Sequence, residues 1–239
     1  AEASGVVGQR SFVSGGFNQS SEAAGFTLGR PSGVAFDGAT LLVADRDFHR
    51  VLRVALPLGP ESEVLEVLGQ PNARLALPNA GREVALDTLR EPGALSTADG
   101  TLAVADTGNH RVLLRRPDVR PVVVGQRDGT SGTANGGANA NSATLRSPGG
   151  VATDGRALVV ADTGNNRVLV WLELPRSDGV PADRVFGQER FGDVLANGGR
   201  GDADASTLAL PSAVLIVGED LWVADTGNNR VVGFPRFRD

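Results

Sequence analysis

The chain has 239 residues and a formal net charge of −5, with 41% hydrophobic and 21% charged residues. This length suffices for one large all-β domain. The charge pattern contains no long basic run and so disfavours a nucleic-acid surface, which needs a basic stripe. Because the chain contains no Cys, disulfides, thiolate metal sites and cysteine nucleophiles are excluded.

The sequence does not define the cellular compartment of the protein. No apolar run reaches the ~18–20 residues that a membrane-spanning helix needs, and no signal peptide is recognisable. The chain also contains no Met, so we expect a processed or trimmed product. A cysteine-free chain is compatible with the cytosol and with an oxidising compartment.

Four copies of one short segment organise the chain. They are ADRDFHRV at 44–51, ADTGNHRV at 105–112, and ADTGNNRV at 161–168 and 224–231. Apolar runs flank each copy, and the residues between them suit a turn because Gly and Asn accept positive φ. Each copy therefore predicts a β-hairpin.

A Gly-Gln pair and a proline precede every hairpin at constant distances. The Gln lies 36 or 37 residues before the Asp of the hairpin, and the Pro lies 14 residues before it. This spacing divides the chain into repeats at approximately 10–70, 71–126, 127–188 and 189–239, the last completed by residues 1–9. We expect the four repeats to form a single domain covering residues 1–239.

Each repeat contains four candidate strands: one after the proline, two in the hairpin, and one before Gly-Gln. Four short antiparallel strands in each of four repeats predict an all-β, four-bladed β-propeller. The chain opens with a spare fourth strand and ends after a third. We therefore expect residues 6–9 to pair with 230–234, which closes the ring and covers two sheet edges. The rival arrangement is an open array that closes only on dimerisation.

The pattern Pro-x-Gly-Val-Ala, then Val-Ala-Asp-Thr-Gly-Asn-His/Asn-Arg-Val, resembles the NHL repeat. The resemblance implies a propeller, but one fold hosts many functions. Family members include protein- and RNA-binding modules, a lyase that cleaves peptidyl-hydroxyglycines, and many bacterial secreted proteins. A secreted or cell-surface location is favoured. This chain departs from the usual repeat in having an insert of roughly 20 residues after each Gly-Gln.

An Asp and an Arg recur in every hairpin and are interpreted as structural residues. The Asp can accept hydrogen bonds from backbone N–H groups of the turn, and the Arg five residues later can pair with it or reach the next blade. One active site does not need four identical copies. The pairs are Asp45 with Arg50, Asp106 with Arg111, Asp162 with Arg167 and Asp225 with Arg230.

Two histidines, His49 and His110, occupy the same position of successive hairpins, where the other two hairpins carry Asn. The simpler interpretation is a turn residue that makes one hydrogen bond. The alternative is a metal or acid–base site shared by adjacent blades. Two histidines do not make the three-His zinc site that the resemblance to the lyase implies, so carboxylates such as Asp45 or Asp106 would have to complete it.

The first hairpin differs from the others because Arg46-Asp47-Phe48 replaces Thr-Gly-Asn. An exposed aromatic side chain between two opposite charges is a candidate ligand contact. Drift in a tolerant turn is the simpler interpretation.

The four inserts, at 10–30, 71–91, 127–147 and 189–210, are the main candidates for ligand binding. In a propeller these connections and the hairpin turns lie on the same face, and loops on a rigid scaffold usually carry binding residues. Alternatively, their recurring Asn and Thr-Leu residues only fold each insert onto its own blade. Insert four carries the candidate contacts Arg200, Asp202 and Asp204.

Metal and cofactor signals are weak. The segment GDADAS at 201–206 resembles part of a calcium loop without its closing Glu. A structural ion is expected at most in the central channel, which the first strands would line. No Ser-His-Asp order, phosphate-binding loop or dinucleotide fingerprint occurs in the chain.

We predict a monomeric binding or scaffold module rather than an enzyme, with a protein, peptide or saccharide ligand on the insert-bearing face. The alternative is a metal-dependent lyase or lactonase-type hydrolase with its site at the channel mouth. A third possibility is a structural or adhesive role in a larger secreted chain.

Overall fold

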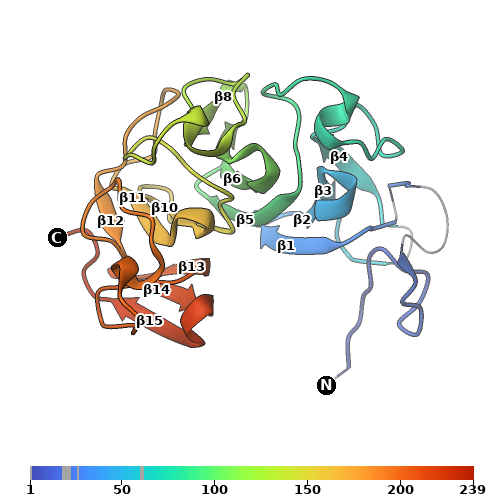
Figure 1. Ribbon diagram of the computed structural model, residues 1–239. Helices are drawn as coiled ribbons and strands as arrows, with labels where there is room; N and C mark the ends of the chain where they lie inside the picture. Colours follow the sequence, from blue (N-terminus) through green and yellow to red (C-terminus); the bar gives the residue numbers. More distant parts are fainter. Residues whose placement is uncertain (1, 18–22, 26, 60–61) are drawn as a thin grey trace.

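Each repeat forms one antiparallel sheet in the computed structural model, which describes residues 2–17, 23–25, 27–59 and 62–239 (Figure 1). Blade 1 consists of β1 (Pro31–Phe36), β2 (Leu41–Asp45), β3 (Arg50–Val54) and β4 (Val64–Leu68). Blade 2 consists of β5 (Pro92–Ala98), β6 (Thr101–Asp106), β7 (Arg111–Arg116) and β8 (Val119–Val124). Blade 3 consists of β9 (Gly150–Thr153), β10 (Leu158–Asp162), β11 (Arg167–Trp171) and β12 (Arg184–Phe186). Blade 4 consists of β13 (Pro211–Val217), β14 (Asp220–Asp225) and β15 (Arg230–Phe234).

The repeated hairpin turns are single turns of 3₁₀-helix. They are η2 (Arg46–Phe48), η4 (Thr107–Asn109), η6 (Thr163–Asn165) and η8 (Thr226–Asn228). The residue after each turn is left-handed, with φ between 52° and 55°. This position is occupied only by His and Asn, which tolerate the left-handed region better than most residues.

The inserts pack against the hairpin turns of their own blades. Inserts two, three and four each contain a short 3₁₀ segment: η3 (Pro78–Gly81), η5 (Ala134–Gly137) and η7 (Ala196–Gly199). In blade 2 the amides of Asn79 and Asn109 exchange two hydrogen bonds of 3.2 and 2.8 Å. Equivalent amide pairs join the inserts and turns of blades 3 and 4. The corresponding Asn18 of insert one lies outside the described residues.

The apolar core lies between blades. We call the two faces of a blade its forward and rear faces. Each cluster joins the forward face of one blade to the rear face of the next. The cluster between blades 1 and 2 includes Leu42, Ala44 and Val51 from the former and Leu95, Val104 and Leu113 from the latter. Two further clusters join blade 2 to blade 3 and blade 3 to blade 4 in the same way.

The prediction of four blades built from antiparallel strands is confirmed, but the expected closure is wrong. Residues 6–9 form no strand, and blade 4 has three strands. The segment is held on blade 1 instead: Gly8 lies against the side chain of Leu28, and Gln9 Nε2 donates to Gly16 O (2.7 Å). Figure 1 shows blade 4 at the other end of an open arc. The expected closed channel, and the ion expected within it, therefore lack their enclosing ring.

A buried ion pair anchors each hairpin. In blade 2, Arg111 Nε donates to Asp106 Oδ2 (2.7 Å), and neither side chain is exposed. The rest of the guanidinium donates to carbonyl oxygens of Ala85 and Thr88 in its own insert and of Gly129 in the next. One Arg therefore joins a hairpin to two inserts. The described part of the chain contains no helix of the length and apolarity needed to cross a membrane.

Arg111→Met tests this role. Burial raises the pKa of the Asp106 carboxyl, and Arg111 is the largest influence that opposes the rise. Its loss leaves a buried, unpaired acid, so the free energy of unfolding should fall by about 3–5 kcal/mol in urea denaturation. Arg82→Met is the control, because Arg82 pairs with Asp87 at the surface, and such exposed pairs contribute little to stability. Equal losses in the two variants would contradict the stabilising role assigned to the buried pair.

Candidate functional site

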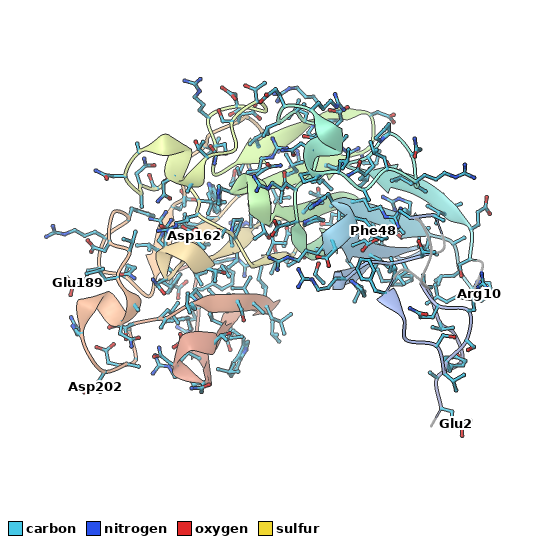
Figure 2. The ribbon with its side chains drawn as sticks, turned by 45° about the vertical axis from the view of Figure 1, so that its right-hand side comes forward. Glu2, Arg10, Phe48, Asp162, Glu189 and Asp202 are labelled. Carbon is cyan, nitrogen blue, oxygen red and sulfur yellow. The ribbon has the colours of Figure 1, made fainter. Side chains whose placement is uncertain are left out.

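The residues proposed from the sequence as ligand contacts do not form one site. Arg46, Asp47, Phe48 and His49 lie at the hairpin turn of blade 1. The acidic residues of insert four belong to the opposite end of the arc. In Figure 2, Phe48 and Asp202 lie on opposite sides of the molecule. These two groups cannot contact the same small ligand.

Phe48 is buried rather than exposed, with a relative exposure of 6%. Its ring meets Phe17 edge-on at 5.7 Å between centroids, and the Arg50 guanidinium lies 5.0 Å from the ring centre. Phe48 occupies the position that Asn109 has in blade 2. An aromatic contact with the insert thus stands where the other blades have an amide pair. The expectation of an exposed recognition residue is wrong.

The charged neighbours of Phe48 are engaged in ion pairs. Arg46 donates to Glu91 (3.1 Å), which lies at the start of blade 2, and Asp47 accepts from Arg30 (2.8 Å). Both pairs are partly exposed. Arg46 therefore contributes to the junction between blades 1 and 2.

The side chain at the histidine position accepts a hydrogen bond from the segment that leads into the next blade. His49 Nδ1 accepts a hydrogen bond from the backbone N–H of Glu91, and His110 Nδ1 accepts one from that of Ser147, both at 3.0 Å. In blade 3, Asn166 Oδ1 accepts from Leu210 N–H (2.8 Å). Burial lowers the pKa of both histidines, which keeps the accepting nitrogen unprotonated.

The side chains proposed for a metal site do not fit one. Asp45 and Asp106 each hold an Arg in a buried ion pair, and each histidine uses one ring nitrogen at a blade junction. Within the described ranges, no three or more His, Asp or Glu side chains gather as a metal-binding group. These residues do not provide the donor set of a three-His zinc site.

The recurring Gln is buried beside the inserts. The Gln of each Gly-Gln pair at 70, 126 and 188 is at least nine-tenths buried. Gln126 Nε2 donates to His110 O (3.0 Å) and to Thr133 O (2.7 Å), and Gln188 makes the equivalent bonds. Among the described residues, the Oε1 atoms of Gln70, Gln126 and Gln188 have no partner. A buried acceptor usually finds a donor, so these three atoms are exceptions within the described chain.

Two of these glutamines line cavities formed by the inserts. Gln126 lines a cavity of about 780 Å³ together with Thr130, Ser131, Asn135, Asn141 and Thr144. Gln188 lines one of about 480 Å³ together with Asp193, Leu195, Arg200, Ser206 and Thr207. Both cavities have charged and apolar residues on their walls. In the first, hydroxyl and amide side chains are the most numerous, and its two charged residues, Arg127 and Asp178, are held in ion pairs with Asp128 and Arg120.

Of the three contacts proposed in insert four, Arg200 lines the second cavity. It donates to Glu189 (3.0 Å) and to Asp204 (2.7 Å). Hydrogen bonds from the Ser206 hydroxyl and backbone N–H lower the pKa of Asp204 to about 2. Asp202 is exposed and does not line the cavity. The glutamines were recognisable in the sequence by their recurrence, but their spacing alone did not reveal an unpaired acceptor.

Comparison with known proteins identifies the repeat. Residues 145–171 match the NHL repeat, which confirms the resemblance for the third repeat. No curated protein matches the chain.

The solved structures that this chain resembles are distant. Hydrazine synthase of Kuenenia stuttgartiensis is 15% identical, with a TM-score of 0.49; the match covers 86% of this chain and 46% of that one. Virginiamycin B lyase from Staphylococcus aureus is 16% identical, with a TM-score of 0.48; the match covers 87% of this chain and 58% of that one. The computationally designed Ika4 protein is 10% identical, with a TM-score of 0.46; the match covers 86% of this chain and 91% of that one. The chain thus spans about half the length of the two natural proteins, and such similarity does not bear on its activity.

The junction histidines predict a specific pH dependence. As pH falls through the ordinary value of 6.5, the unfolded histidines bind protons while the folded ones resist. Stability should then fall by up to about 1.4 kcal/mol per pH unit for each His. His49→Asn/His110→Asn retains an acceptor, as in blade 3, and should remove this contribution. Urea denaturation at neutral and mildly acidic pH measures it, and an unchanged pH slope in the variant would contradict the assignment.

Proposed function

We propose that this NHL-repeat propeller is a binding module whose ligand is a neutral saccharide held in the insert cavities. The observation that carries the proposal is the set of hydroxyl and amide side chains on the wall of the insert-three cavity: Thr130, Ser131, Asn135, Asn141 and Thr144. The hydroxyl groups of a sugar can donate hydrogen bonds to such side chains and accept hydrogen bonds from them.

The walls support the same ligand class. Around Gln126, hydroxyl and amide side chains offer both donors and acceptors, as a polyhydroxylated ligand requires. The inserts stand on rigid blades, since their Asn residues pair with the hairpin turns. In the part of the chain that the structure describes, no group of residues specifically favours the lyase or hydrolase alternative.

Cavity-filling variants test the proposal on an array of neutral oligosaccharides. Ala138 lines the cavity of insert three and is exposed. Gly192 lines that of insert four, and a Cβ atom there would make only an ordinary contact, at 3.6 Å from Ala140 O. We expect Ala138→Trp or Gly192→Trp to weaken saccharide binding at least tenfold. Asn139→Trp is the control, because Asn139 is exposed beside the first cavity and does not line it.

The outcomes separate the ligand classes. Capture of neutral glycans that either filling variant abolishes, and the control retains, supports the proposal. Capture only of uncharged peptides on a parallel array overturns the saccharide assignment. Glycan binding that neither filling variant affects overturns the assignment to these cavities, and no capture on either array overturns the proposed function.

A further inference from the structure

Each end of the arc exposes apolar side chains at positions that interior blades bury. On the forward face of blade 4, Trp222 is 43% exposed and Val231 is 65% exposed. The residues at their positions in the first three blades are completely buried against the next blade. They are Leu42, Ala103 and Val159 for Trp222, and Val51, Val112 and Val168 for Val231.

Blade 1 exposes part of its rear face, since Val43 and Leu52 are buried there beside Val7 but β1 is not covered. On β1, Val34 is 64% exposed and Phe36 is 57% exposed. The residues at the position of Val34 in blades 2 and 3, Leu95 and Val151, are only 8% and 5% exposed because the preceding blade covers them. The exposed forward face of blade 4 thus carries apolar residues at the positions where blades 1 to 3 contact the next blade. The exposed β1 of blade 1 carries an apolar residue where blades 2 and 3 contact the preceding blade.

Polar connections at the end of blade 4 are also incomplete. Thr107 and Thr163 each donate to the carbonyl of the proline that begins the next blade, at 2.7 and 2.6 Å. The equivalent Thr226 shares a hydrogen bond with Ser212 of its own blade instead. Asn166 fastens blade 3 to blade 4, whereas its equivalent Asn229 has no side-chain partner in the described ranges.

The N-terminal segment carries the groups that these connections lack. Gln9 donates to the carbonyl seven residues later, as Gln70, Gln126 and Gln188 do. Those three also donate to the hairpin turn of the preceding blade. In the described chain Gln9 has no such turn beside it, because no described blade precedes blade 1. The turn that would serve is the one ending at Asn229.

Strand pairing leads to the same conclusion. The residue before each Gly-Gln pairs with the second residue of the hairpin's returning strand: Leu68 with Val51, Val124 with Val112, Phe186 with Val168. By this register Val7 is the partner of Val231. Yet Val7 lies against blade 1, and the outer edge of β15 has no neighbouring strand in the described chain.

We propose that blade 4 of one copy docks onto blade 1 and residues 6–9 of a second copy, and that two such contacts close an eight-bladed ring. The contact continues the repeated junction already present within the chain. A head-to-tail contact of this kind either closes a ring or grows into a filament. Propellers have typically 4–8 blades, so two copies form the only multi-copy ring in that range. A dimer replaces the monomer expected from the sequence.

Solution mass and one edge variant test the contact. Light scattering after size-exclusion chromatography should give about twice the 24.6 kDa of one chain. Val231→Asp places a charge in the docked face and should give a folded monomer, because this side chain is exposed in the single chain. Val119→Asp is the control, since Val119 is 57% exposed on β8 away from both ends, and it should remain a dimer. A monomeric wild-type protein, or larger polymers, would overturn the proposal.

A disulfide distinguishes closure between copies from closure within one chain. Opposite residues of paired antiparallel strands have Cα atoms about 4.5–5.5 Å apart, which a disulfide spans. The chain has no other Cys, so oxidised Val7→Cys/Val231→Cys should run as a covalent dimer on a denaturing gel. An internal disulfide at the mass of one chain would show that the ring closes on itself, and absence of any cross-link would show that these strands do not pair.

Discussion

A blade of this protein has two apolar faces and cannot cover both of them by itself. In the described chain, the forward face of one blade packs on the rear face of the next at three junctions. Stability of a repeat array depends on such nearest-neighbour contacts. At the two ends the covering is incomplete, which is why Trp222 and Val231 at one end and Val34 at the other are exposed. The open arc in Figure 1 therefore corresponds to half of the proposed eight-bladed ring, whose new contacts repeat the junctions within the chain.

The polar residues of the repeat serve this stacking and also shape the inserts. Each buried Arg joins its hairpin to carbonyl groups of the insert before it, and the first three also reach the insert after it. The amide pairs hold the inserts on the turns, and the Gln of each Gly-Gln pair spans the turn and the following insert. Once its two donor bonds are made, this Gln can point only its Oε1 atom elsewhere. The unpaired acceptors of Gln126 and Gln188 thus follow from the scaffold.

Much of the fold was predictable because the residues that build it recur. The hairpins, their Asp and Arg, and the count of four blades follow from identical residues at constant spacing. Closure was not predictable, because spacing reveals which strands could pair but contains no information on the curvature between blades. The burial of Phe48 was missed for a related reason: its partner Phe17 stands where the other three inserts carry Pro78, Ala134 and Ala196. The glutamines were visible as markers, but an unpaired Oε1 atom depends on three-dimensional contacts.

The central claim is that the exposed end faces meet in a second copy of the chain. Hydrogen–deuterium exchange of the native protein in solution tests it directly, through the backbone amides of residues 6–9 and β15. If these strands pair between copies, their amides should be protected to the same degree as those of β3 and β4, which pair within blade 1. Rapid exchange at residues 6–9 and along the outer edge of β15, alongside full protection of β3 and β4, would contradict the account.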